Sequence, residues 1–317
     1  MQLDNLLGVI LAAGKGARIN PFNQNFAKAT LPICNRPLLR YQLSAMRRLG
    51  VEEVIIVVGH LGYQIAEAIG DGHADGVTVH YVEQTETLGL AHAVGLLEPM
   101  VDRPFLLFLG DIFFVTDDLQ PLLDVASLPD VHAVLAAKSE ADPKAIRRNY
   151  SILLHPDGSV RRVVEKPRYL ENNIKGCGLY LFDLPIFDAI RRTPRTAARN
   201  EYEITESIQI LLDDGYRVEI ASVVQDDVNV TVARDLLLCN VRELERRGID
   251  NLIGEDVRMK PGVTVERSVI GDRCVVENAI RIQNSVILPG TIVTRASDID
   301  GLIMTPQESV ACDMTGI

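Results

Sequence analysis

The chain has 317 residues, 32 basic and 43 acidic, and its net charge of −11 argues against a general nucleic-acid-binding surface. This length exceeds what one hydrophobic core usually supports, so a large domain followed by a smaller one is expected. The five cysteines are scattered and form no C-x-x-C pair, which argues against a zinc site and a disulfide framework and indicates a reducing compartment. The first apolar stretch lacks a basic leader and is too short to span a bilayer. We therefore expect a cytoplasmic protein that binds neither membrane nor nucleic acid.

The first part of the chain alternates short apolar runs, typical of buried strands, with longer runs that have helical spacing. This alternation predicts an α/β fold with a Rossmann-like, mixed but mostly parallel sheet and helices on both faces. Residues 151–182 are richer in hairpin-like strands. The predicted strands are Leu7–Leu11, Val54–Val58, Val77–Val82, Phe105–Leu109 and His132–Ala136, and the predicted helices are Leu38–Leu49, Leu61–Ile69, Ala91–Leu97, Leu119–Val125, Glu203–Leu212 and Val232–Arg247.

A different period begins after Gly248. Branched apolar residues recur every six positions from Val257 to Ile299, and only Arg281 breaks this register. Such hexads are typical of a left-handed parallel β-helix, in which each short strand turns one side chain inward. A plain β-meander is the alternative, because six is a multiple of the strand period of two. The sequence thus predicts a first domain over residues 1–248, a short β-helix over 249–302 and a tail over 303–317.

A glycine-rich turn follows the first predicted strand, in the run Gly8-Val-Ile-Leu-Ala-Ala-Gly-Lys-Gly-Ala-Arg18. Glycines at the end of a strand let backbone N–H groups approach and cradle phosphates. The dinucleotide-binding fingerprint is excluded because Ile19 stands where its third glycine is needed. A Walker A loop is excluded because Gly16, and not serine or threonine, follows Lys15. A tight turn that binds no ligand is the alternative.

The continuation of this turn contains Arg18, Pro21, Lys28 and the run Leu31-Pro-Ile-Cys-Asn-Arg-Pro-Leu38. Together these residues resemble the signature of the sugar-1-phosphate nucleotidylyltransferase family, L-A-A-G-x-G-T-R-L-x-P followed by P-K-x-L-x-P. The resemblance implies that the arginine and the lysine contact the triphosphate, where they would offset the charge that develops during transfer. The nucleotide-binding residues that it implies in and after the turn are Leu11, Ala12, Ala13, Gly14, Gly16 and Arg18.

Two further segments resemble the same family in chain order. The run Gln84-Thr-Glu-Thr-Leu-Gly89 is similar to its base-recognition element, so the Gln84 side chain and the Gly89 backbone are expected to bond the nucleobase. Asp111 ends the buried run that begins at Phe105, at the sheet edge where α/β proteins bind ligands. The resemblance makes this carboxylate a ligand of Mg²⁺.

The second half of the predicted domain resembles the family's sugar-phosphate elements. Glu165, Lys166 and Pro167 match an E-K-P motif, in which the glutamate bonds the sugar and the lysine pairs with its phosphate. Tyr150 stands at the family's Tyr-Gly pair, whose backbone also meets the sugar. Arg199 begins a run similar to R-G-E-x-E-I-T, whose arginine helps to bind the sugar phosphate.

Asn229 has the spacing of the family's second metal ligand, which is also an asparagine in the N-acetylglucosamine-1-phosphate branch. Asp226 and Asp227, just upstream, are the charged alternatives, and Mg²⁺ prefers carboxylates. The spacing favours Asn229, and on this basis Asp227→Asn is expected to be nearly neutral.

The resemblance implies an enzyme that joins a nucleoside triphosphate to a sugar 1-phosphate, with Mg²⁺ as cofactor and pyrophosphate as product. The best match is dTTP with glucose 1-phosphate, and UTP, GTP and CTP are the alternative nucleotide substrates. A regulatory homologue that binds nucleotide sugar without catalysis is the alternative class of protein. Acyl transfer in the β-helix would need a histidine base, and all six histidines lie at or before His155. We also expect a homo-oligomer. The implied catalytic residues are Arg18, Lys28, Asp111 and Lys166.

Overall fold

The computed structural model describes residues 1, 3–19, 21–197 and 200–315. It contains two compact units that are interleaved in the sequence: Met1–Gly14 with Gln42–Asp227, and Lys15–Tyr41 with Val228–Ile317. These units divide the chain at other positions than the predicted domain boundaries at residues 248 and 302, which stay a prediction. None of the helices in the described ranges is long and apolar enough to cross a lipid bilayer.

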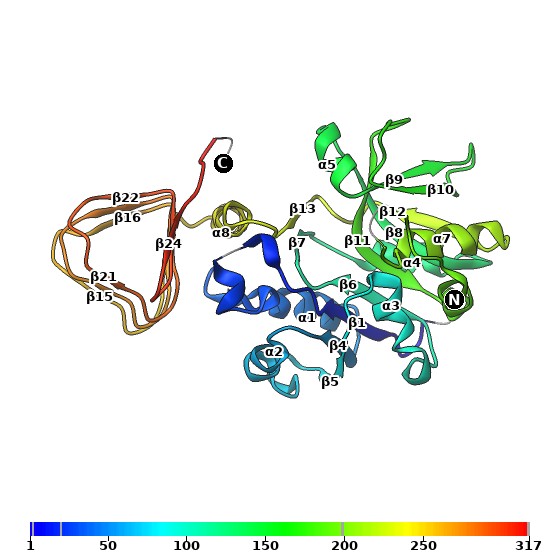
Figure 1. Ribbon diagram of the computed structural model, residues 1–317, viewed down its shortest axis with the longest axis horizontal. Helices are drawn as coiled ribbons and strands as arrows, with labels where there is room; N and C mark the ends of the chain where they lie inside the picture. Colours follow the sequence, from blue (N-terminus) through cyan, green and yellow to red (C-terminus); the bar gives the residue numbers. More distant parts are fainter. Residues whose placement is uncertain (2, 20, 198–199, 316–317) are drawn as a thin grey trace. The chain divides into compact units, whose positions relative to one another are not determined.

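The first unit is built on a mixed sheet whose central strands are parallel, as Figure 1 shows. One path through the sheet has the order β10-β9-β11-β6-β1-β4-β5, and β8 joins β11 to β12. Strands β4 and β6 flank β1 in parallel, whereas β11 is antiparallel to β6 and β8. The predicted α/β sheet is confirmed. Its strands are β1 (Leu7–Ala12), β4 (Glu53–Val58), β5 (Thr78–Glu83), β6 (Phe105–Leu109), β8 (Val131–Ser139), β9 (Tyr150–Leu154), β10 (Val160–Glu165), β11 (Ile174–Phe182) and β12 (Arg217–Ala221).

Helices pack on both faces of this sheet because its central strands are apolar on both sides. The helices are α1 (Leu38–Arg48), α2 (Gly62–Ile69), α3 (Leu90–Gly95), α4 (Gln120–Ala126), α5 (Pro143–Arg148), α6 (Pro185–Arg192) and α7 (Ile204–Asp213). Val9 of β1 lies in one buried cluster with Val94 of α3 and Ile208 of α7. Its neighbour Gly8 faces the other side, where a Cβ would lie 2.8 Å from the sulfur of Met46 in α1.

The second unit joins the segment after the glycine turn to the last long helix and the β-helix. Its elements include β2 (Pro32–Ile33), β3 (Arg36–Pro37) and α8 (Ala233–Arg247). Cys34 and Asn35 connect β2 to β3 with positive φ angles of 47° and 60°, as tight hairpin turns require. The Cys34 N–H donates to Oδ1 of Asn240 in α8 at 2.7 Å, and the Asn35 amide donates to the Ile270 carbonyl at 2.9 Å. These bonds hold the hairpin against the rest of the unit.

The last part of the chain is a three-sided parallel β-helix, so the predicted hexads are confirmed as β-helical coils. Its strands are β14 (Asn251–Ile253), β17 (Ser268–Ile270), β20 (Val286–Ile287) and β23 (Leu302–Met304) on one side, β15 (Arg258–Met259), β18 (Val275–Val276) and β21 (Ile292–Val293) on the second, and β16 (Thr264–Glu266), β19 (Arg281–Gln283) and β22 (Ile299–Asp300) on the third. Arg258 pairs with Val275 and Val275 with Ile292, so stacked residues lie 17 positions apart. Each coil is thus one residue shorter than three hexads. Because of this offset, the buried core takes Ile270, Val276 and Ile282 from the neighbouring register.

Residues 303–315, in the segment predicted to be a tail, contain further secondary structure. Strand β24 (Ser309–Ala311) pairs antiparallel with β23, and the Cys312 N–H donates to the Gly301 carbonyl at 2.7 Å. The guanidinium of Arg234, in the first turn of α8, donates to the carbonyls of Asp313 at 2.8 Å and Thr315 at 2.5 Å. Residues 309–315 are therefore held by backbone hydrogen bonds to β23 and Gly301 and by side-chain hydrogen bonds from Arg234.

Candidate active site

The carboxyl ends of the parallel strands meet at one edge of the first unit. The N–H of Gly110, just after β6, donates to the Leu11 carbonyl of β1 at 2.9 Å. A Cβ on Gly110 would lie 2.9 Å from the same oxygen, and one on Gly59, after β4, would lie 2.7 Å from the Ala13 carbonyl. Glycine is therefore required at both positions, since these backbones approach too closely for a side chain. The predicted nucleotide-binding residues from Leu11 to Gly14 stand in the middle of this edge.

Asp111 follows Gly110 in the turn between β6 and β7 (Ile112–Val115). Gln42 of α1 is 3% exposed, and its Nε2 donates at 2.9 Å to each of the carbonyls of Leu109 and Ile112. One amide thus holds both residues that flank the turn, so the Asp111 carboxylate is presented from a fixed backbone. This role of Gln42 could not be predicted from the sequence, because glutamine in an amphipathic helix is usually solvent-exposed.

The predicted base-recognition residues lie at the neighbouring end of β5. The Gln84 N–H donates to the Val58 carbonyl at 2.8 Å, and its side-chain Nε2 lies 3.0 Å from Nδ1 of His92 in α3. Gln84 is 6% exposed, and no group in the described part of the chain donates to its second amide atom, Oε1. Gly89, at the N-terminus of α3, has a φ of 116°, and a Cβ there would lie 2.4 Å from the Tyr202 carbonyl. A buried amide with an open acceptor is suited to bind a ligand donor.

The predicted sugar-binding residues Tyr150 and Glu165 are opposite each other on β9 and β10. The Tyr150 ring is buried and stacks on Tyr180 at 6.2 Å between centroids, and burial raises the pKa of its hydroxyl well above the ordinary value. Because this side chain is buried, Tyr150 is expected to contact a sugar only through its backbone, as the family resemblance implies. Glu165 accepts from Oγ1 of Thr205 at 3.3 Å, and its other oxygen lies 3.0 Å from Nζ of Lys166.

Lys166 has a φ of 40°, in the left-handed region that lysine rarely adopts, and its N–H donates to the Asn149 carbonyl at 2.8 Å. Such strained backbone persists where the surroundings fix it, often at functional positions. Thr205, which contacts Glu165, belongs to the run that begins at Arg199. Arg199 itself lies outside the described residues.

A buried cluster of charges that sequence analysis missed lies between β8, β11 and β13 (Asp226–Asn229). Lys175 Nζ lies 2.7 Å from both carboxylate oxygens of Asp227, and Lys138 Nζ lies 3.0 Å from Asp227 and from Asp226. Lys138 also lies 3.3 Å from Glu140. Burial disfavours the charged form of Lys138, but Asp227 and Glu140 outweigh it and raise the pKa of this lysine. Asp227, only 3% exposed at its side chain, is thus paired with two lysines, so Asp227→Asn is expected to lower the free energy of unfolding. The expectation that this variant keeps nearly the same turnover stays a prediction.

The remaining predicted residues belong to the second unit. Gly16 has a φ of 60°, and its carbonyl accepts from the Ile19 N–H at 2.9 Å, which forms a short turn that carries Arg18. Nζ of Lys28 lies 3.5 Å from Oδ1 of Asn229. Two residues that are 201 positions apart, one matched to the triphosphate and one to the metal, are therefore neighbours.

The donor groups of Asp111 and Asn229, a carboxylate and an amide oxygen, are hard oxygen ligands that fit Mg²⁺. Oδ1 of Asn229 accepts from Oγ1 of Thr231 at 3.1 Å and already faces a cation, the Lys28 ammonium. The described residues contain no group of three or more His, Cys, Asp or Glu side chains arranged to hold a metal. The oxygen chemistry of each of these two side chains fits Mg²⁺, as the predicted pair of ligands requires.

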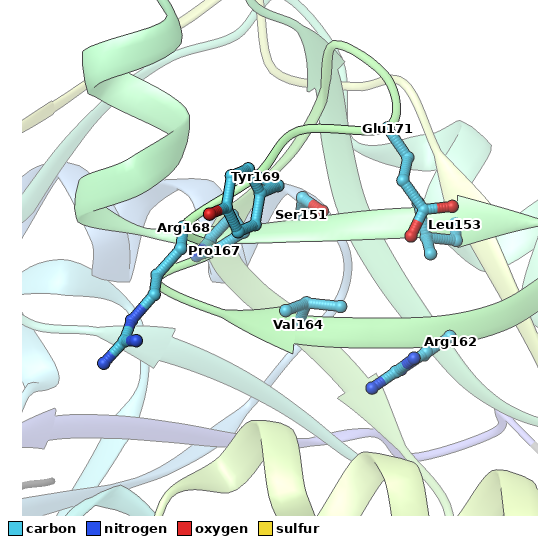
Figure 2. Close-up of a pocket in the computed structure, with 8 residues that line it drawn as sticks. All are labelled: Ser151, Leu153, Arg162, Val164, Pro167, Arg168, Tyr169 and Glu171. Carbon is cyan, nitrogen blue, oxygen red and sulfur yellow. The ribbon is translucent and has the colours of Figure 1, made fainter.

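A pocket of about 230 Å³ lies on the hairpin of β9 and β10. Ser151, Leu153 and Val164 form its floor, and Figure 2 shows Tyr169 and Glu171 extending toward it from the loop that follows Lys166. Side chains alternate along a strand, so this floor is the face opposite to Tyr150 and Glu165. The pocket is therefore separate from the predicted sugar-binding residues.

Comparison with known proteins gives one family. A family model described as nucleotidyl transferase matches residues 7–227. A glucose-1-phosphate thymidylyltransferase of Streptomyces antibioticus is 31% identical over 97% of this chain and 84% of its own length. The UTP–glucose-1-phosphate uridylyltransferase AglF of Haloferax volcanii is 32% identical over 67% of this chain and 85% of its own. A crystal structure described as a glucose-1-phosphate thymidylyltransferase from Bacillus anthracis is similar with a TM-score of 0.67 at 25% identity, covering 75% of this chain and 94% of that one.

Proposed function

This chain belongs to the nucleotidyl transferase family, and on that premise we propose that it transfers a nucleotidyl group from a nucleoside triphosphate to a sugar 1-phosphate. We propose dTTP and glucose 1-phosphate as the preferred substrates. The observation that carries the proposal is the carboxyl edge of the sheet, where a glycine turn for phosphates, a carboxylate for a metal and a buried amide for a base follow neighbouring strands. Ligands of open α/β sheets bind at this edge.

The base preference is proposed from the hydrogen-bonding groups of Gln84 and Gly89. Oε1 of Gln84 is an open acceptor, and the Gly89 N–H is a backbone donor without an acceptor in the described ranges. An acceptor beside a donor complements the imide edge of thymine or uracil, which offers a ring N–H next to a carbonyl. Cytosine and adenine offer a ring acceptor at this position and would leave Oε1 unpaired. Guanine also offers a ring N–H next to a carbonyl, so this pattern suits GTP as well. The uridylyltransferase relative makes UTP the second candidate.

The proposed reaction is a single in-line displacement. A phosphate oxygen of the sugar 1-phosphate forms a bond to the α-phosphorus as the bond from that phosphorus to the pyrophosphate oxygen breaks. Arg18 and Lys28 hold the triphosphate, and Lys166 with Arg199 holds the sugar phosphate, so the protein supplies position and charge. When bound by Asp111 and Asn229, Mg²⁺ would offset the negative charge of the phosphates.

We propose that residues 1–248 carry the reaction and that the β-helix serves stability or assembly of a homo-oligomer. All six histidines lie outside the β-helix, at or before His155, which leaves it without the usual base for acyl transfer.

The proposed function is tested by measuring pyrophosphate release with five nucleoside triphosphates against a panel of sugar 1-phosphates. The expected result is magnesium-dependent release that requires both substrates, with dTTP and glucose 1-phosphate as the fastest pair. No release with any pair, or release that is independent of the sugar phosphate, would contradict the proposal.

Gln84→Ala is expected to reduce the discrimination between dTTP and CTP by about 1–3 kcal/mol, because the imide N–H loses its acceptor. The KM for the sugar phosphate should stay the same. The measurement is kcat/KM for each triphosphate, with the exposed Gln120→Ala as the control. An unchanged preference would show that Gln84 does not bind the base.

The variants of Asn229 test the second metal ligand. Asn229→Asp should keep activity and lower the Mg²⁺ concentration required for half-maximal rate, because a carboxylate attracts the ion more strongly. Asn229→Leu should be severely impaired. Magnesium titrations of the initial rate give both results. If Asn229→Leu keeps the wild-type magnesium dependence, the ligand is another residue, and the assignment of Asn229 is wrong.

A further inference from the structure

His92 is the only described side chain that bonds the Gln84 amide. Its Nδ1 lies 3.0 Å from Nε2 of Gln84, and its ring stacks on Tyr202 with an interplanar angle of 23°. The guanidinium of Arg195 lies 5.1 Å from the centre of the Tyr202 ring on which His92 stacks. The imidazole is therefore held by ring contacts as well as by the amide.

This contact links the orientation of the Gln84 amide to the position of the proton on the His92 ring. An amide group presents a donor, Nε2, and an acceptor, Oε1, and a neutral imidazole has one nitrogen of each kind. When Nδ1 of His92 accepts from Nε2 of Gln84, the imidazole proton is on Nε2 of the ring, and Oε1 of Gln84 is left for the ligand. If the proton were on Nδ1, the amide would turn over and present its N–H₂ group to the ligand instead.

We infer that His92 is a positioning residue that selects the base by fixing the orientation of the Gln84 amide. This inference rests on the proposed function and extends it to a residue that does not touch the base. With Nε2 of Gln84 turned toward His92, the site presents an acceptor, which suits the ring N–H of thymine or uracil. Turning the amide over would suit the ring acceptor of cytosine. With the ring proton on Nε2, His92 makes that orientation unfavourable, because two acceptors, Oε1 of the amide and Nδ1 of the ring, would then face each other.

The close packing around Gln84 favours a fixed orientation of its side-chain amide. Gln84 is 6% exposed, and the Tyr202 backbone is bound to the start of α3 by two hydrogen bonds, from the Tyr202 N–H to Leu88 at 2.8 Å and from the Ala91 N–H to Tyr202 at 2.9 Å. The helix that carries His92 and the segment that carries Tyr202 are therefore joined directly. A free amide would turn over at little cost, but an amide that is bonded to this ring loses a hydrogen bond when it turns.

The test compares His92→Leu, which removes the acceptor, with His92→Asn, whose Oδ1 can take the place of Nδ1. His92→Leu should reduce the ratio of kcat/KM for dTTP to that for CTP about tenfold, the value of one hydrogen bond, with the KM for glucose 1-phosphate unchanged. His92→Asn should restore most of the ratio. Val94→Ala, a buried substitution in the same helix, controls for lost packing and should leave the ratio unchanged.

A ratio that is unchanged in His92→Leu, or reduced equally in His92→Asn and Val94→Ala, would overturn the inference while leaving the proposed function intact. If no substrate pair releases pyrophosphate, the proposed function fails, and equilibrium binding of dTTP and CTP to the same variants tests His92 independently. Nitrogen NMR of His92 in the wild-type protein with dTTP gives a second test. The inference requires the proton on Nε2 of the ring, and a proton on Nδ1 would refute it.

Discussion

Asp111→Asn is expected to fold normally and to lose magnesium-dependent turnover by about two orders of magnitude or more, the usual effect of removing a principal electrostatic stabiliser. The substitution keeps the size of the side chain and leaves the turn intact, since Gln42 holds the carbonyls of Leu109 and Ile112 and not the carboxylate. Initial rates at saturating Mg²⁺ and a urea unfolding curve measure the two parts of this expectation.

Asp117→Asn is the matched control, because Asp117 is an exposed aspartate a few residues further on. It should retain the wild-type rate. Turnover near the wild-type level in Asp111→Asn would remove Asp111 from the proposed metal site, even if the enzyme makes nucleotide sugars.

Lys175→Met is expected to lower the free energy of unfolding by about 3–5 kcal/mol. Lys175 is 4% exposed at its side chain and pairs with both oxygens of Asp227, so its removal leaves a buried carboxylate with Lys138 as its remaining close cation. Removing one partner of a buried ion pair is costly because the other charge has lost its solvation. Chemical denaturation of the variant and the wild type measures the difference.

Lys144→Met, at an exposed position of α5, should change stability by well under 1 kcal/mol and serves as the control. The double variant Lys175→Met/Asp227→Leu should recover part of the loss, because it removes both charges. If the double variant is less stable than Lys175→Met by the full cost of Asp227→Leu alone, the two side chains are not coupled, and the ion pair does not stabilise the fold.

The elements of the fold could be predicted because their signals are local. Strand β1 is apolar on both faces, and the hexads after Gly248 have a period that neither helices nor exposed loops show. The exact register of the β-helix could not be predicted, since a coil of 17 residues omits one position at a corner, and this omission leaves no separate mark in a six-residue repeat.

Candidate site residues could be named from the sequence only where short motifs contain them, and their roles stay predictions. Two recognisable runs contain such residues, one with Gly110 and Asp111 and one with Glu165 and Lys166. In the structure the side chains of Glu165 and Lys166 form an ion pair at 3.0 Å. The supporting contacts were not predictable, because they depend on strand order. Lys138 and Lys175 meet because β11 runs antiparallel to β8 in a register that pairs these two residues. No local pattern specifies which distant strand becomes a neighbour.

The antiparallel strand β24 covers the last strand on one side of the β-helix. A parallel β-helix presents at its end a strand with open N–H and C=O groups, onto which another coil, from the same or a different molecule, can pair in the same direction. On the β23 side, strand β24 occupies these groups with the opposite polarity, from Leu302 opposite Ala311 to Met304 opposite Ser309. Strand β24 therefore covers the edge of β23 with a strand of opposite direction, and shortening the chain before Ser309 would expose that edge to parallel pairing.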